Sequence, residues 1–329
     1  MSQNCTLDAM DEKVWILQLA VYIPTFLLGL VLNPLAIYKF SSYLRKGQED
    51  YAATSIYMIN LAVFDLVLVL SLPVRAYLSK PGHSSPKAYC TLVECLYFIS
   101  MYGSIFTICF ISVDRFLALQ FPMWARNLRT PRMITGICCI LWVSVLAGST
   151  PVYKFHEEKD LEATCFRNMS KSTWSTGVII PLEVFGFLLP MSIVGFCSFR
   201  TIQVLLRCQD EHWAQHKACI RTIAANLAVF VVSFLPVHLG FLLQFLVRNG
   251  VIEHCGAKWA ISCFLQLFLC LSNTNCCLDI FCYYYVIKEV RMGIKLRWPS
   301  RVLLSTRTPG PPGPKGRGLG SRKLRPSPH

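Results

Sequence analysis

The stretch TIAANLAVFVVSFLPVHLGFLLQFLV, residues 222–247, decides the fold of this chain, because it contains no Asp, Glu, Lys or Arg. A helix needs roughly 20 apolar residues to cross the hydrocarbon layer of a bilayer, which is ~30 Å thick. A helix on the surface of a soluble protein would show a polar face, and this stretch shows none. In lipid, a helix satisfies its own backbone hydrogen bonds. We therefore expect these residues to span a membrane as a helix.

Six further stretches have similar length and composition. Ile16–Tyr38 and Met133–Tyr153 carry no charge, and Ala52–Val74, Thr91–Val113, Ser172–Phe199 and Trp259–Ile287 each carry one acid, namely Asp65, Glu94, Glu183 and Asp279. These patterns predict an all-α membrane protein, with a seven-transmembrane helix bundle over residues 14–287 and an extracellular N-terminus over residues 1–13.

Basic residues indicate the orientation. If the N-terminus is outside, the inner segments hold 22 of the 32 Lys and Arg residues, as the positive-inside rule requires. This predicts a multi-pass plasma-membrane protein with an extracellular N-terminus. Two glycosylation sequons, at Asn4 and Asn168, then fall outside. A net charge of +14 could also indicate nucleic-acid binding, but the charge flanks the spans and forms no folded basic domain.

The C-terminal region divides into two parts. Residues 288–297 alternate basic and apolar side chains, which predicts a short amphipathic helix on the inner membrane surface. Residues 298–329 hold seven Pro and five Gly and no acid, so they cannot bury enough apolar surface to offset the entropy of ordering. We expect a disordered cytoplasmic tail.

Polar residues inside the spans suggest a central cluster. A charged group at mid-bilayer costs at least about 2.5 kcal/mol on insertion scales, so each one calls for a role. One reading is a sodium site made by Asp65, Ser104, Asn275 and Asp279. The other is a hydrogen-bond network with no ion, which would also involve Asn33 and Asn273. We expect no other cofactor.

Arg75 and Glu94 lie about one turn inside the outer ends of their spans. They could form a structural ion pair, or Arg75 could bind a phosphate or carboxylate with its guanidinium fork. Aromatic and Met residues below a basic rim would suit a ligand with an anionic head and an apolar body. The residues concerned are Lys80, Tyr97, Phe98, Met101, Gln244 and Arg248. His238 is interpreted as a pocket-lining or packed histidine rather than a metal ligand.

Motifs for catalysis are missing from the sequence. It contains no nucleophile elbow, no Gly-rich phosphate loop and no pair of histidines at metal-binding spacing on one helix. We therefore do not expect an enzyme.

Landmarks in the seven spans resemble those of the rhodopsin-like (class A) G-protein-coupled receptors. They are Gly29-x-x-x-Asn33, Asn60-Leu61-Ala62-x-x-Asp65, Cys90 with Cys165, Asp114-Arg115-Phe116, Trp142, Pro190, Phe234-Leu235-Pro236 and Asp279-Ile280-Phe281-Cys282-Tyr283. The resemblance covers nearly the whole chain and implies a receptor that engages a heterotrimeric G protein, with arrestin as a further partner. It assigns activation and coupling to Asp114, Arg115, Phe116, Pro236, Asp279 and Tyr283.

The resemblance also implies two disulfides, Cys90–Cys165 and Cys5–Cys255. A bridged Cys5 could block glycosylation of Asn4. The sequence departs from the family pattern at Phe116, Phe234 and Ile280, and no acid at the start of the sixth span faces Arg115. We therefore expect measurable signalling without ligand.

Longer stretches, such as Asp50–Asp65, Cys95–Gly103 and Val231–Gly240, resemble the lysophosphatidylinositol-responsive branch of the family, also described as atypical cannabinoid-like receptors. This implies an orthologous receptor with an anionic lysophospholipid agonist and signalling to Rho and intracellular calcium. The head group would lie near Arg75, Lys80 and Arg248. The acyl chain would run between Tyr97, Phe98, Met101, Phe185 and Phe234.

Two alternatives remain from the residues themselves. The same fold could bind another anion, such as a nucleotide or an aromatic acid, although this would need more basic residues on the third, sixth and seventh spans. A transporter would need a continuous polar path, which the uncharged fourth and sixth spans do not provide.

Overall fold

The computed structural model describes residues 8–47, 49–83, 85–154, 162–163, 165, 171–207 and 213–291. Within them, seven helices are long and apolar enough to cross a membrane. They cover Glu12–Arg45, Tyr51–Leu78, Lys87–Gln120, Pro131–Val152, Thr176–Arg207, His216–Arg248 and Cys255–Lys288. The predicted helical bundle is therefore confirmed.

Four of the spans each consist of one continuous helix. These helices are α1 (Asp8–Arg45), α2 (Glu49–Leu78), α3 (Lys87–Gln120) and α8 (Trp213–Arg248). The fourth span is α5 (Pro131–Gly148), followed by the short η1 (Thr150–Lys154). The fifth joins α6 (Thr176–Glu183), the π-helix η3 (Val184–Leu188) and α7 (Leu189–Arg207). The seventh joins α9 (Cys255–Leu271), the 3₁₀ turn η4 (Ser272–Thr274) and α10 (Asn275–Arg291).

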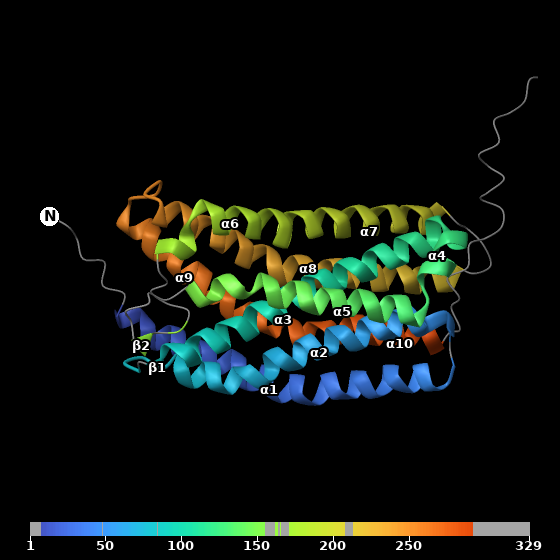
Figure 1. Cartoon of the computed structure of the whole chain (residues 1–329), viewed down its shortest axis with the longest axis horizontal. Coiled ribbons are helices and arrows are strands. Elements are labelled where there is room, and N and C mark those ends of the chain that lie inside the picture. The colour runs from blue at the N-terminus through green and yellow to red at the C-terminus, as the bar shows by residue number, and fades with distance from the viewer. Residues whose placement is uncertain are drawn as a thin grey trace, which may run out of the picture. The chain divides into compact units, whose positions relative to one another are not determined.

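The long helices lie side by side, as Figure 1 shows, with β1 (Ser85–Pro86) and β2 (Glu162–Ala163) at one end and α4 (Pro122–Leu128) at the other. The two strands pair antiparallel, with Ser85 opposite Ala163. We call the end with the strands the disulfide end, and the end with α4 the Arg115 end.

The predicted Cys90–Cys165 disulfide is confirmed, with Cα atoms 4.9 Å apart. It ties the segment after β2 to the first turn of α3. Cys255 is also disulfide-bonded, but its predicted partner, Cys5, lies outside the described residues. The sequons at Asn4 and Asn168, residues 292–297 of the predicted surface helix and the predicted tail lie outside them as well.

α3 lies at the centre of the bundle, where it contacts α2, α4, α5, α7 and α8. Close approach at mid-height depends on Gly103, where a Cβ atom would lie 2.3 Å from the ring of Phe64. Phe64 stacks in turn on Trp142 of α5 at 3.9 Å between ring centroids. The indole donates a hydrogen bond to Asn60 over 3.0 Å, and Asn60 donates to Thr107 over 2.9 Å. Three spans are thus joined by packing and by hydrogen bonds that lipid cannot replace.

Apolar side chains cover the outward faces of the bundle. Leu27, Val31 and Leu35 of α1 are at least half exposed, as are Ile140 and Val143 of α5. In water, an apolar surface of this extent would drive association, whereas lipid solvates it. Together with the seven spans, this defines a multi-pass membrane protein.

Candidate ligand-binding and signalling site

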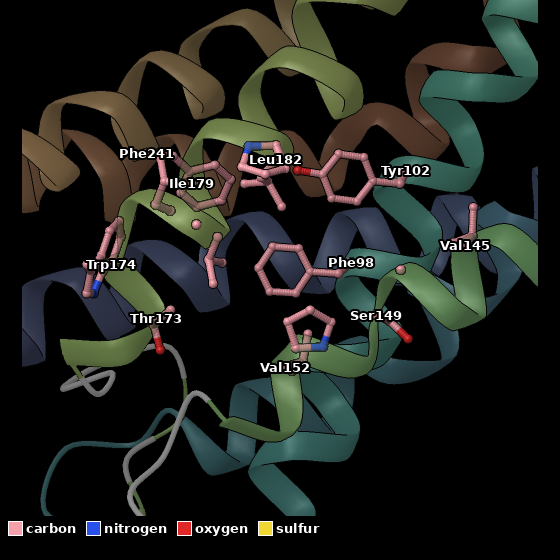
Figure 2. A pocket seen from close by; sticks show the side chains of 15 residues that line it. Phe98, Tyr102, Val145, Ser149, Val152, Thr173, Trp174, Ile179, Leu182 and Phe241 are labelled. Atoms are coloured by element: carbon pink, nitrogen blue, oxygen red, sulfur yellow. The ribbon is translucent and has the colours of Figure 1, made fainter.

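A cavity of about 320 Å³ lies beside α3 at the disulfide end. It is enclosed by α3, α5, η1, η2 (Lys171–Trp174), α6 and α8. Figure 2 shows its lining side chains, among them Phe98, Tyr102, Val145, Ser149, Val152, Thr173, Trp174, Ile179, Leu182 and Phe241. Most of these side chains are aliphatic or aromatic, and Ser149 already donates its hydroxyl to the Leu146 carbonyl over 2.8 Å. The cavity therefore suits an apolar ligand, or the apolar part of one.

Arg75 lies elsewhere, in a packed polar region between α1, α2, α3 and η4. Its side chain is 1% exposed, and Nη1 donates to Oδ1 of Asn273 over 3.1 Å. Its guanidinium lies over the Tyr97 ring, 4.6 Å from the centroid, and near the Tyr22 ring at 5.4 Å. The Tyr97 hydroxyl is 2.9 Å from Ser272 Oγ. We call this region, defined by Tyr22, Arg75, Tyr97, Ser272 and Asn273, the arginine cluster.

Tyr97 and Phe98 are consecutive on α3 and so point about 100° apart around the helix axis. Phe98 lines the cavity, whereas Tyr97 packs in the arginine cluster. The structure therefore does not bring the predicted buried cation and the cavity together. Arg75 is absent from the described residues that line the cavity.

The other predicted ligand residues take up several positions. Glu94, Met101, Phe234, His238 and Gln244 are buried, and Lys80 and Arg248 are exposed at the disulfide end. Asn249, which follows Arg248, donates to the Trp174 carbonyl over 3.3 Å. This bond holds the end of α8 against Trp174, which lines the cavity, and Arg248 is the residue before Asn249.

Phe185 was predicted to line the acyl-chain path, and this is wrong. Its side chain is 63% exposed, whereas Phe187 is 2% exposed and stacks on the His238 ring at 4.3 Å. The π-helix η3 explains the difference, because its wider turn changes which residues face inward. His238 also contacts Glu183, with Nδ1 3.2 Å from Oε2. No group of three or more His, Cys, Asp or Glu side chains that could hold a metal occurs in the described part of the chain.

The predicted sodium-site residues lie in a buried cluster. Asn275 donates to Asp279 Oδ2 over 3.1 Å, and Tyr283 donates to Asp65 Oδ2 over 3.1 Å. Four further oxygens are buried without a hydrogen-bond partner among the described residues, namely Oδ1 of Asp65, Asp279 and Asn275, and Oγ of Ser104. Oxygen donors of this kind fit a small hard cation.

At the Arg115 end, the two charged residues of the Asp114-Arg115-Phe116 motif have different partners. Asp114 Oδ1 accepts a hydrogen bond from Nε of Arg129, which caps α4, over 3.0 Å. Arg115 Nη1 lies 3.9 Å from the Cys219 sulfur on α8. The family motif thus links α3 both to α4 and to α8. Pro236 lies inside α8, and Tyr283 lies between Asp65 and Asn33, 3.5 Å from the latter.

Comparison with known protein families identifies the family to which this chain belongs. The family model described as 7 transmembrane receptor (rhodopsin family) matches residues 32–283. The chain therefore belongs to the rhodopsin family of seven-transmembrane receptors, whose members are receptors that act through G proteins.

Individual relatives extend the likeness over most of the chain. It is 61% identical over 312 residues to G-protein coupled receptor 55 of Mus musculus, which covers 92% of this chain and 95% of that protein. It is 62% identical over 305 residues to the protein of that name from Homo sapiens, with the same coverage. It is 32% identical over 295 residues to lysophosphatidic acid receptor 6 of Gallus gallus, which covers 87% of this chain and 94% of that protein.

Several features of the site were not predicted from the sequence. Tyr102, Trp174 and Phe241 line the cavity, yet each looks like an ordinary aromatic residue of a span or loop. Glu183 could have been found, because it is the one acid in an apolar stretch of 28 residues, Ser172–Phe199.

Proposed function

We propose that this receptor binds an anionic lysophospholipid of the lysophosphatidylinositol type, through a cavity that opens at the extracellular side. The apolar cavity beside α3 is the observation that carries the proposal. A single acyl chain needs an apolar channel and no hydrogen-bond partners, which describes most of this lining. One relative is named as a lysophosphatidic acid receptor, and that name supports the same chemical class of ligand.

The anionic head would lie at the rim of the cavity. None of the described residues that line the cavity is basic. Arg248 follows Phe241 by seven residues on α8, so the two lie on one face of the helix, about 10 Å apart along its axis. A chain beside Phe241 therefore places its phosphate near Arg248. Lys80 lies at the same end, and Arg75 adds a buried positive charge from the arginine cluster.

Orientation and signalling follow from this assignment. With the disulfide end outside, Arg115 and α4 face the cytoplasm and the basic inner segments. A ligand that favours one packing of α8 against α3 would shift the population toward G-protein engagement. We propose coupling to the G-protein classes that activate Rho and mobilise calcium, with arrestin as a second partner. The Asp65 cluster would hold a sodium ion that stabilises one of the two packings.

The test is a lipid panel on cells that express the receptor, with Rho activation and calcium release as readouts. Lysophosphatidylinositol and lysophosphatidic acid should activate, whereas zwitterionic lysophosphatidylcholine and diacyl phosphatidylinositol should not. A response equal to that of untransfected cells, or a response only to nucleotides or aromatic acids, would refute the proposal.

A variant series locates the head group. Replacing both Lys80 and Arg248 by Ala should lower lysophosphatidylinositol potency at least about tenfold, because two charge-assisted contacts are lost. Lys258→Ala removes a positive charge at the same end of the bundle and serves as the matched control. If the control lowers potency as much as the double variant, the effect is general electrostatics rather than contact with the head group.

A further inference from the structure

Three polar side chains meet beside the apolar cavity: Tyr102 of α3, Glu183 of α6 and His238 of α8. Nδ1 of His238 lies 3.2 Å from Oε2 and 3.3 Å from Oε1 of Glu183. The Tyr102 ring lies 5.9 Å from the His238 ring, and Tyr102 itself lines the cavity. We call these three residues the polar triad. Each comes from a different span, so the fold has to bring them together.

The local backbone explains their approach. Glu183 immediately precedes the π-helix η3, and π-bulges are often found at functional sites. Within η3, Gly186 leaves room for Tyr102, because a Cβ at this position would lie 2.7 Å from Cε1 of the tyrosine ring. Phe187 then stacks on His238, with the ring planes 9° apart. The imidazole is held in place from one side by Phe187 and through Nδ1 by Glu183.

Two polar atoms of the triad are left over. The Tyr102 hydroxyl and Nε2 of His238 are buried, and neither has a hydrogen-bond partner within the described residues. A buried donor or acceptor without a partner is costly, and most such groups in proteins are paired. Figure 2 shows the Tyr102 oxygen pointing toward Leu182, across the end of the cavity. A group that enters this end of the cavity can therefore reach it.

The chemistry of these atoms selects the missing partner. A carboxylate only accepts hydrogen bonds, so in the neutral imidazole the proton is on Nδ1, facing Glu183, and Nε2 is an acceptor. The Tyr102 hydroxyl can donate or accept. A hydroxyl group satisfies both, because it donates to Nε2 and accepts from Tyr102. An anion would be repelled by Glu183, and a methylene group would leave both atoms unpaired.

We propose that the polar triad binds a hydroxyl group carried by the apolar body of the ligand. This site is separate from the one for the anionic head, and it deepens the proposed function, on which it rests for the identity of the ligand. The receptor would therefore distinguish a hydroxylated acyl chain from a plain one of the same length.

The signalling experiment uses lysophosphatidylinositol with an octadecanoyl chain and a series with a hydroxyl at successive positions along that chain. At one position, potency should exceed that of the plain lipid about tenfold, because a site built for a hydroxyl discriminates against its absence. Tyr102→Phe should abolish this gain, so that the hydroxylated lipid and the plain lipid have the same potency in this variant. His238→Phe, which retains the ring stack on Phe187, should do the same.

Tyr77→Phe is the matched control, since it removes the same atom from an exposed tyrosine of α2 and should retain the gain. A packing role alone would not make the effect of Tyr102→Phe depend on the hydroxyl of the ligand. The proposal is overturned if no position on the chain gives a gain in the wild-type receptor, or if the gain is equally large in Tyr102→Phe.

A second measurement does not depend on the anionic head or on signalling. Methyl hydroxyoctadecanoates and plain methyl octadecanoate are compared for their ability to protect the purified receptor against heat. The hydroxylated ester should protect at a concentration about tenfold lower in the wild type and should lose this advantage in Tyr102→Phe. If this holds while the lipid panel fails, the head-group proposal is wrong and the triad stands. Equal protection by both esters would overturn the triad.

Discussion

Two faces of α3 at the disulfide end differ in what lies beside their buried polar groups. On the Tyr97 face, the guanidinium of Arg75 donates to Asn273 and lies over the Tyr97 ring, and the Tyr97 hydroxyl meets Ser272. On the Phe98 face, a cavity remains, and the polar triad at its edge has two buried atoms without partners. Polar groups that bind one another mainly stabilise the bundle, whereas unpaired polar atoms beside an open volume can bind a ligand.

Of the variants, Arg75→Ala should change stability and agonist potency the most. The substitution removes the buried guanidinium that lies over the Tyr97 ring and donates to Oδ1 of Asn273. The free energy of unfolding should therefore fall by about 3 kcal/mol. Agonist potency at matched surface level should also fall about tenfold, because the head loses one positive charge. Thermal unfolding of the purified receptor and a Rho assay measure the two effects. Arg75→Lys retains the charge without the fork and should recover more potency than stability. Unchanged potency in Arg75→Ala would remove this residue from the head-group site.

Filling the cavity should lower agonist potency without lowering stability, unlike the loss of Arg75. Gly177 lines the cavity, and a Cβ there would have no atom within 4 Å. Gly177→Leu should therefore reduce lysophosphatidylinositol potency about tenfold while leaving heat stability equal or higher, because it occupies the ligand volume without a clash. Gly136→Leu is the matched control, since Gly136 also has open space but does not line the cavity. Equal losses in the two variants would show that the cavity is not the binding site.

The Asp65 cluster offers a third comparison, because it combines made hydrogen bonds with four unpaired oxygens. If a sodium ion binds there, raising sodium should lower agonist affinity severalfold, since it stabilises the packing that the agonist disfavours. Asp65→Asn should remove the sodium effect, and potassium should not replace sodium. Radioligand competition in membranes at fixed ionic strength measures this. A sodium effect that survives in Asp65→Asn would locate the ion elsewhere.

The smallest change in signalling is expected from variants at the Arg115 end, where basal output is the quantity measured. Arg115 contacts the thiol of Cys219, which is a weaker restraint than a carboxylate would be. The unliganded receptor should therefore signal above untransfected cells at matched surface expression. Cys219→Glu should lower this basal output about twofold or more, because a charge-assisted contact holds α8 against α3 more strongly. Cys219→Ser controls for loss of the thiol. Absence of basal output in the wild type would contradict the prediction.

Much of the architecture could be predicted from the sequence, because the solvent imposes it. The apolar length of each span requires a helix, and the Cys90–Cys165 pair belongs to the family pattern. The position of the cavity could not be predicted, because a void is what five or more packed elements leave between them. Phe185 illustrates the limit. The inward-facing residues of an α-helix can be predicted from its period of about 3.6 residues per turn. The π-helix η3 has a wider turn, so this prediction fails there and Phe187 faces inward instead of Phe185.

The hydrogen bond between Asn249 and Trp174 connects the end of α8 to the wall of the cavity. At one end of α8, this bond joins the helix to Trp174. Near the other end, Cys219 contacts Arg115. Pro236 lies inside α8 between these two contacts, about 20 Å from Asn249 and about 26 Å from Cys219 along the helix axis, and its ring removes one backbone hydrogen bond. If α8 turned about Pro236, an occupant that displaced Trp174 would move the Cys219 end through a slightly larger distance than the Asn249 end. A single helix, α8, thus connects the wall of the cavity with the residue that contacts Arg115.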